Sequence, residues 1–246
     1  MSGAPAAASA EGALLRVEGL SKSFGGVLAV DRLDFTLAPG ELRCLIGPNG
    51  AGKSTLFSLL AGLHQPDAGR ILFKGENISG LSAYHRVRKG LCLKFQTTRI
   101  YRGMTVAQNL LIGGGGRPDG KSNGRLEWAL AALHLDTERD VPAAALPHSH
   151  QQWLEICLAL ATVPELLLLD EPAAGMTPEE TSLTTRFLLD LNRQGLAILV
   201  VEHDMAFVRQ IGRSVTVLHY GRIFSEGTFE EIEANQEVRR IYLGVQ

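Results

Sequence analysis

The sequence predicts an α/β fold whose core is a mixed, largely parallel sheet, with an antiparallel β subdomain and an inserted helical subdomain. Strand-like apolar runs alternate with helical patterns after residue 165, which is typical of a parallel sheet. Apolar and polar residues alternate over 14–38, which indicates half-buried antiparallel strands. Residues 97–164 contain few β-rich runs. We therefore expect a core made of 14–96 and 165–246, with 97–164 inserted as a helical subdomain.

The composition is that of an ordinary globular chain. Its 246 residues are 45% hydrophobic and 20% charged with a formal net charge of −2, so no global charge favours nucleic acid as a partner. The 3 cysteines lie far apart in the sequence, which suits a reducing cytoplasm. Aliphatic runs such as 196–201 are far shorter than the roughly 20 residues that span a bilayer. The Ala, Gly, Ser and Pro bias of residues 1–13 predicts a disordered N-terminal lead.

The first half of the core is predicted to contain a strand that leads directly into a helix. The apolar run 42–47 is typical of a buried strand, and helical spacing over 54–63 predicts a helix that ends near Gly62. Further strands are expected at 70–78 and 91–95. The glycine-rich turn between the first strand and the helix is therefore the segment to examine for chemistry.

The remaining elements follow the same reasoning. Residues 113–124 are rich in glycine and predict a flexible loop, and helical patterns follow at 125–135 and 151–161. In chain order we then expect a strand at 166–170, a helix at 178–194, a strand within 196–204, a short helix, a strand at 214–224 and a charged C-terminal helix. Residues 177–180 (TPEE) form a capping box with proline at the first helical position.

The turn at 47–55 reads GPNGAGKST and fits the phosphate-loop pattern G-x-x-x-x-G-K-[ST]. Its glycines let backbone N–H groups turn inward around an anion, and the start of the next helix adds partial positive charge. Lys53 is expected to reach the β- and γ-phosphates, and the Ser54 hydroxyl to ligate Mg²⁺. The nucleotide-binding residues predicted here are Gly47, Pro48, Asn49, Gly50, Ala51, Gly52, Lys53, Ser54 and Thr55.

Two acidic residues follow the apolar run LLLL at the end of a predicted strand. Ligands gather at the carboxyl ends of parallel strands, so both carboxylates are expected beside the phosphate loop. Asp170 is predicted to hold Mg²⁺ through water, and Glu171 to act as the general base on the attacking water. Together with the loop, these residues predict hydrolysis of a nucleoside triphosphate.

Several motifs in one order resemble the ATP-binding subunits of ABC transporters over nearly all of 14–246. They are GPNGAGKST (47–55), KFQ (94–96), LPHSHQQWLEI (146–156), LLLLDEP (166–172) and VVEHD (200–204). The resemblance implies the ABC ATPase fold of the P-loop NTPases, ATP as the nucleotide, Mg²⁺ as the cofactor, and a dimer that closes around each ATP.

The resemblance also implies roles for three residues outside the phosphate loop and the acids. Phe24 lies where the family places an aromatic ring that stacks on adenine. Gln96 matches the catalytic glutamine that senses Mg²⁺ and water, and His203 matches the histidine that contacts the γ-phosphate. Taken singly, Phe24 can also be a core aromatic, Gln96 a solvated loop residue and His203 a surface histidine, and it is the common order and spacing of the motifs that favours the functional roles.

The stretch LPHSH departs from the family's signature sequence LSGGQ, which contacts the ATP held by the other subunit. Its residues are Leu146, Pro147, His148, Ser149 and His150. Pro147 has neither the serine hydroxyl nor an N–H to donate, and Ser149 adds a Cβ where the family has glycine. Losing one or two phosphate donors costs about 2–4 kcal/mol, which slows turnover tens to hundreds of times.

Two hypotheses follow from this departure. In the first, the chain pairs with a second ATP-binding subunit that has an intact signature, which gives one competent and one weak site; a homodimer would have two weak sites. In the second, His148 or His150 supplies a replacement donor, which makes turnover sensitive to pH near 6–7. A metal site and a serine nucleophile are disfavoured, because the stretch opens an apolar helix and no third ligand is near.

Within the family, the chain resembles the branch of importers of branched-chain amino acids and of urea or short amides. The stretches 96–110, 171–177 and 241–244 are similar to that branch, and 151–156, 201–208 and 215–223 also resemble its urea-type subunits. The implied partners are two integral-membrane permeases and, indirectly, a solute-binding protein, with the chain peripheral at the cytoplasmic face of the inner membrane. The alternatives are a soluble ABC ATPase without a transport role and an ATP-binding scaffold.

Overall fold

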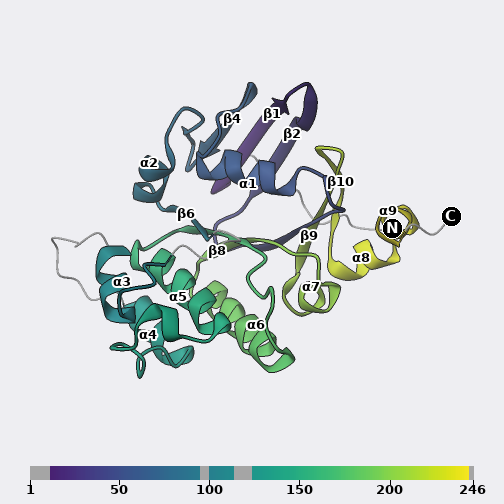
Figure 1. Cartoon of the computed structure of the whole chain (residues 1–246). Coiled ribbons are helices and arrows are strands. Elements are labelled where there is room, and N and C mark those ends of the chain that lie inside the picture. Colours follow the sequence, from purple (N-terminus) through teal and green to yellow (C-terminus); the bar gives the residue numbers. More distant parts are fainter. Residues whose placement is uncertain (1–11, 95–99, 114–123, 244–246) are drawn as a thin grey trace.

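The computed structural model describes residues 12–94, 100–113 and 124–243. Within these ranges the predicted α/β class is confirmed, with two sheets and helices packed between and around them (Figure 1). Gln96, residues 1–11 of the predicted lead and most of the predicted loop 113–124 lie outside the described residues. None of the helices in the described ranges combines the length and apolar character that crossing a bilayer requires.

The smaller sheet is antiparallel and has the strand order β2-β1-β4-β5. Its strands are β1 (Leu15–Phe24), β2 (Val27–Leu37), β4 (Ala68–Phe73) and β5 (Glu76–Asn77). The prediction of one continuous strand at 70–78 was wrong, because the chain turns between β4 and β5 at two residues with positive φ. The predicted antiparallel character of 14–38 is confirmed by the pairing of β1 with β2.

The larger sheet has the strand order β10-β9-β3-β8-β7-β6. Its strands are β3 (Leu42–Ile46), β6 (Leu91–Lys94), β7 (Leu166–Asp170), β8 (Ala197–Val201), β9 (Ser214–His219) and β10 (Arg222–Gly227). All neighbouring pairs are parallel except β9 and β10, which form a hairpin. The expected strand at 214–224 is therefore two strands, and the carboxyl ends of β3, β7 and β8 meet at one edge.

Both faces of the larger sheet are covered. Helix α1 (Lys53–Ala61) lies between the two sheets (Figure 1), and its Leu56 and Leu60 share a buried cluster with Leu168 of β7. Leu167 and Leu169 belong to the other cluster, which contains residues of the helices on the opposite face. Burial on two sides explains why β7 reads as a continuous apolar run rather than an alternating one.

The opposite face carries most of the remaining helices. These are α3 (Val106–Gly113), α4 (Gly124–Ala132), α5 (His148–Ala161), α6 (Pro178–Arg193) and α7 (Met205–Ile211). Helices α8 (Phe229–Ala234) and α9 (Gln236–Leu243) follow at the C-terminal end, and α2 (Ala83–Arg88) lies beside α1 (Figure 1). The predicted single C-terminal helix is thus two. Helices α2 and α3 were not predicted, since 6 and 8 residues are too few for a clear helical period.

The structure places the start of α5 earlier than predicted. The helix begins at His148 rather than at residue 151, with Pro147 at the N-cap position, so most of the LPHSH stretch is helical. Helix α6 begins as predicted, with the Thr177 side chain and the Glu180 side chain completing a capping box. The two helix starts face each other, which brings the stretch close to the segment that follows β7.

Candidate active site

The phosphate loop requires glycine for a steric reason at two positions. A Cβ on Gly52, whose φ is +104°, would lie 2.3 Å from the carbonyl oxygen of Ala29. A Cβ on Gly47 would lie 2.3 Å from the carbonyl oxygen of Leu218. These carbonyls belong to β2 and β9, so the backbone of the loop packs closely against a strand of each sheet.

Helix α1 starts at Lys53 with Gly52 as its N-cap, which provides no side-chain cap for the first turn. The N–H groups of that turn are therefore available to an anion, and the helix dipole favours negative charge there. The Lys53 ammonium donates to the carbonyl oxygens of Gly47 and Pro48 at 2.6 and 3.0 Å. Its position over the loop is the one expected for a residue that contacts phosphates.

Burial lowers the pKa of Lys53, and the charges of Glu171 and Asp170 oppose that shift. For Asp170 burial raises the pKa, and so does the charge of Glu171, whereas Lys94 and Lys53 act in the opposite direction. The pocket thus concentrates two carboxylates in a poorly solvated place. A cation bound there would oppose the rise in the pKa of Asp170.

A cavity of about 430 Å³ connects the loop to the two acids. Its lining residues are Ala29, Asn49, Gly50, Ala51, Gly52, Lys53, Ser54, Thr55, Asp170, Glu171 and Val201. The predicted grouping of the phosphate loop with the acids at the end of β7 is therefore observed. Ala29 and Val201 were not predicted, because apolar residues in distant strands leave no sequence signal for a site.

Hard oxygen ligands suit Mg²⁺, and the Ser54 hydroxyl and the Asp170 carboxylate line the same cavity. No group of three or more His, Cys, Asp or Glu side chains that could hold a metal is found among the described residues. Mg²⁺ commonly keeps several waters and uses only one or two protein ligands together with substrate phosphates. The residues present fit that mode of binding.

Glu171 and His203 contact each other directly. The His203 Nδ1 atom lies 3.2 Å from Oε1 of Glu171, and the His203 side chain is 64% exposed. Glu171 has a φ of +47°, and its N–H donates to the carbonyl oxygen of Val201 at 3.0 Å. A non-glycine residue in the left-handed region is a marker of local strain that often accompanies function.

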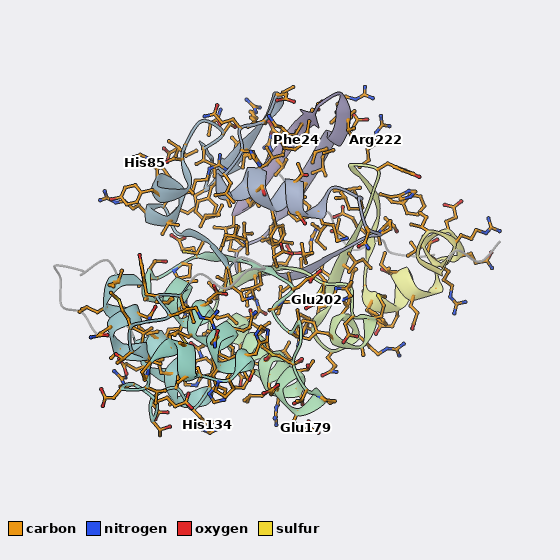
Figure 2. All side chains as sticks on the ribbon, viewed as in Figure 1. Phe24, His85, His134, Glu179, Glu202 and Arg222 are labelled. Atoms are coloured by element: carbon orange, nitrogen blue, oxygen red, sulfur yellow. The ribbon has the colours of Figure 1, made fainter. Side chains whose placement is uncertain are left out.

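The histidine is positioned by its two acidic neighbours. The His203 N–H donates to Oε2 of buried Glu202 at 3.1 Å, and Asp204 caps α7 by accepting from the N–H of Ala206 at 2.8 Å. Glu202 lies in the interior between the sheet and the lower helices (Figure 2). Burial raises the pKa of Glu202, and backbone N–H groups oppose this. Sequence reasoning missed this anchoring role, since nothing in EHD distinguishes a buried acid from an exposed one.

Phe24 lies at the end of β1 in the antiparallel sheet (Figure 2). The residue is 43% exposed, its ring meets the His64 ring edge-on with the centroids 5.2 Å apart, and the Lys22 ammonium lies 5.5 Å from the ring centroid. The ring is not part of the cavity lining that the described residues form. An exposed aromatic ring is available for stacking, and its contact with adenine stays a prediction.

The LPHSH residues make intramolecular contacts. The Ser149 hydroxyl donates to Oε1 of Glu180 at 2.6 Å, and Nδ1 of His150 is 2.7 Å from Oε2 of Glu138. His148 is exposed, and its ring lies against Gly175, where a Cβ would meet it at 3.4 Å. The polar groups of Ser149 and His150 thus point to α6 and to the segment before α5, not outward.

A sequence model of the ABC transporter family matches residues 30–174. The branched-chain amino acid transport ATP-binding protein LivG of Escherichia coli K12 is 36% identical over 249 residues, covering 94% of this chain and 98% of that protein. BraF of Pseudomonas aeruginosa, described in the same words, is 35% identical with the same coverage. The lipopolysaccharide export ATP-binding protein LptB of Haemophilus influenzae is 33% identical over 236 residues, covering 95% and 98%.

Solved structures agree in fold. An ATP-binding cassette of an ABC transporter in its ADP conformation superposes with a TM-score of 0.85 and 29% identity, covering 95% of this chain and 99% of that one. A nucleotide-free cassette gives 0.84 and 28%, covering 95% and 100%. The phosphate loop, the paired acids and the histidine are thus held on a fold that relatives share over nearly its whole length. The chain belongs to the ABC transporter family and is one of its ATP-binding, ATP-hydrolysing subunits.

Proposed function

We propose that the chain powers an ABC importer of small polar or amphipathic solutes, as a peripheral subunit at the cytoplasmic face of the inner membrane. Support comes from the identity to LivG and BraF, both described as branched-chain amino acid transport proteins. LptB, which is described as part of an export system, is less similar. The solute class is branched-chain amino acids or, from the stretches 201–208 and 215–223, urea and short amides.

The contact between Glu171 and His203 carries the catalytic part of the proposal. Glu171 directly follows β7 and lines the cavity, so its carboxylate can accept a proton from water positioned for attack on a γ-phosphate. His203 lies on the same side and can hold the γ-phosphate in place, while Lys53 and the first turn of α1 bind the phosphate chain. Phe24 would stack on adenine.

The Ser54 hydroxyl, the Asp170 carboxylate and the side chain of Gln96 would hold Mg²⁺. When bound, the ion neutralises charge that develops on the phosphates. Asp170 keeps its carboxylate at the cavity wall, next to Glu171 and opposite the loop. With Asp170 holding Mg²⁺, Glu171 is left to act on water, so the two adjacent acids have different roles.

The signature stretch supports an unequal dimer with a second ATP-binding subunit. Ser149 and His150 already bond to Glu180 and Glu138, and Pro147 has no N–H. The chain therefore keeps its own catalytic half but offers the partner's ATP a weak clamp. The competent site is the one that combines Glu171 of this chain with the partner's signature. The two permeases and the solute-binding protein complete the transporter.

Phosphate release by the purified chain, alone and together with the second ATP-binding subunit, tests the ATPase proposal. We expect slow hydrolysis by the chain alone and at least tenfold faster hydrolysis by the pair. Glu171→Gln in this chain should abolish most of the activity of the pair, whereas the equivalent change in the partner should cost little. Full activity of the isolated chain would overturn the unequal dimer, and a pair without phosphate release would show a scaffold.

The solute is tested in proteoliposomes that contain the full transporter and its binding protein. Leucine, urea and acetamide are compared for their ability to stimulate ATP hydrolysis and to accumulate inside the vesicles. Stimulation of ATP hydrolysis by leucine would identify an importer of branched-chain amino acids, and stimulation by urea and acetamide an importer of urea or short amides. Hydrolysis that responds to none of them would overturn the proposed solute class while leaving the ATPase proposal intact.

A further inference from the structure

A lysine and a glutamate lie buried behind the catalytic acids. Lys94 is the last residue of β6, and Glu155 lies in the middle of α5, the helix that begins with the signature stretch. Their charged atoms, Nζ and Oε2, are 4.0 Å apart, and their side chains are 0% and 6% exposed. Such groups are almost never buried unless they are paired, so their position requires an explanation.

Glu155 compensates Lys94 only in part. A separation of 4.0 Å is long for a charge-assisted hydrogen bond, and within the described ranges no acceptor lies within hydrogen-bonding distance of the Lys94 Nζ atom. Oε1 of Glu202 likewise lacks a donor among the described residues. In a poorly solvated interior the ammonium therefore acts on more than one carboxylate.

The strand register places Lys94 next to the metal site. Lys94 pairs with Leu169 across β6 and β7, so Asp170 is the next residue along the neighbouring strand. Lys94 faces α5, on the same side as Leu169, whereas Asp170 opens into the cavity on the side of α1. The ammonium thus lies behind the carboxylate and does not line the nucleotide cavity.

The charges that act on the pKa of Lys94 come from the same carboxylates. Burial lowers the pKa of Lys94, and Glu155, Asp170, Glu202 and Glu171 oppose that shift in decreasing order. Lys94 also acts more strongly than Lys53 in offsetting the rise in the pKa of Asp170. The buried lysine is therefore the stronger positive neighbour of Asp170, although Lys53 belongs to the phosphate loop.

We propose that Lys94 is a positioning residue of the ATPase, a buried counter-ion shared between Glu155 of α5 and the acids at the ends of β7 and β8. It joins the signature helix to the catalytic edge of the sheet. It also lowers the negative potential at Asp170 and Glu171, which keeps the two adjacent carboxylates in place and moderates their attraction for Mg²⁺. The inference rests on the proposed Mg²⁺ site.

Removing this charge has a definite electrostatic sign. Without the ammonium the site is more negative, so it should bind Mg²⁺ more tightly and repel metal-free ATP. For unit charges several ångströms apart, we expect the Mg²⁺ concentration for half-maximal nucleotide binding to fall about three- to tenfold, and the affinity for ATP in EDTA to fall by a similar factor. A purely structural ion pair predicts neither change.

The test measures binding of a fluorescent ATP analogue to the full chain, with and without Mg²⁺, alongside thermal unfolding. Lys94→Met removes a buried positive charge beside Glu155 and can prevent folding, so the deciding variant is Lys94→Met with Glu155→Met, in which apolar contacts replace both charges. We expect this double variant to fold and to show both shifts in the same directions but smaller, because the negative charge of Glu155 is lost together with the ammonium. Lys94→Arg should keep the parent values, and Lys74→Met, which removes an exposed lysine paired with Glu165, serves as the matched control.

Asp170→Asn separates this inference from the proposed function. That variant should raise the Mg²⁺ concentration needed, because a ligand and a negative charge are both lost. If Asp170→Asn leaves the Mg²⁺ dependence unchanged, the proposed metal site is wrong. If Asp170→Asn changes it but the folded double variant behaves as the parent chain does, Lys94 is only part of a structural ion pair and the inference is overturned.

Discussion

The imidazole of His203 contacts the carboxylate of Glu171, with Nδ1 and Oε1 3.2 Å apart. The two residues come from different strand ends, since Glu171 follows β7 and His203 lies two residues after β8. Because β7 and β8 are parallel neighbours, their carboxyl ends bring together the proposed base and the histidine that we propose contacts the γ-phosphate. The contact requires no partner chain, because both residues belong to this chain.

Replacing Glu171 with Gln should reduce phosphate release at least 100-fold, because the amide cannot accept the proton of the attacking water. ATP binding, measured by equilibrium dialysis, should be retained, since the phosphate loop is unchanged. Glu179→Gln removes a carboxylate from the first turn of α6 and is the matched control. Equal losses in both variants would argue against a general base at Glu171.

Gly52→Ala should abolish nucleotide binding, because its Cβ would lie 2.3 Å from a backbone oxygen of β2. Gly50→Ala is the matched control: its φ of +78° is also in the left-handed region, but a Cβ there meets nothing within 4 Å. We expect that control to lose about fivefold in affinity, from roughly 1 kcal/mol of backbone strain. Similar affinities for the two variants, measured by isothermal titration, would contradict the steric argument.

Arg86→Met should destabilise the chain by about 3 kcal/mol or more. The buried guanidinium donates to four carbonyl oxygens, those of Leu59, Leu60, Ser79 and Leu81, at 2.5 to 3.0 Å. Without these donors the Leu60 carbonyl oxygen loses the guanidinium, and the Leu59 carbonyl oxygen keeps only the N–H of Gly62 at 3.2 Å. Urea unfolding measures the loss.

Two further variants show whether the hydrogen bonds of the Arg86 guanidinium stabilise the chain. Arg88→Met removes an exposed arginine from the same helix and should change stability by less than about 0.5 kcal/mol. Arg86→Lys keeps the charge but not the planar fork of donors, and should recover only part of the loss. Full recovery with lysine would show that charge, rather than the set of hydrogen bonds, stabilises this corner.

Ser149→Ala should lower stability at neutral pH by about 0.5–1 kcal/mol, because the hydroxyl bonds to Glu180 at 2.6 Å. That hydrogen bond is the main cause that holds the pKa of Glu180 below its ordinary value. A depressed carboxyl pKa contributes stability that is present above the unfolded pKa and is lost as the pH falls through the folded pKa. The difference between variant and parent should therefore shrink below about pH 4, as thermal unfolding at several pH values can show.

Much of the site could be predicted from sequence because its chemistry is local. The phosphate loop needs glycines, a lysine and a hydroxyl at fixed spacing, and an apolar strand that ends in two acids indicates where the carboxylates lie. Helix α6 was predicted correctly from its capping box, whose hydrogen bonds span only four residues. Where the signal was a short turn, as between β4 and β5, the prediction was wrong.

The amino-acid sequence by itself determined the fold class, the ATP-binding loop and the two acids, since these depend on residue type and on spacing within about ten residues. Only the tertiary structure decided that Ser149 bonds to Glu180, that Glu202 is buried beneath His203, and that Lys94 lies behind Asp170. Each of these relations joins residues through strand order or helix packing. Burial and electrostatic coupling arise between segments that are distant in the chain, and a one-dimensional pattern does not record them.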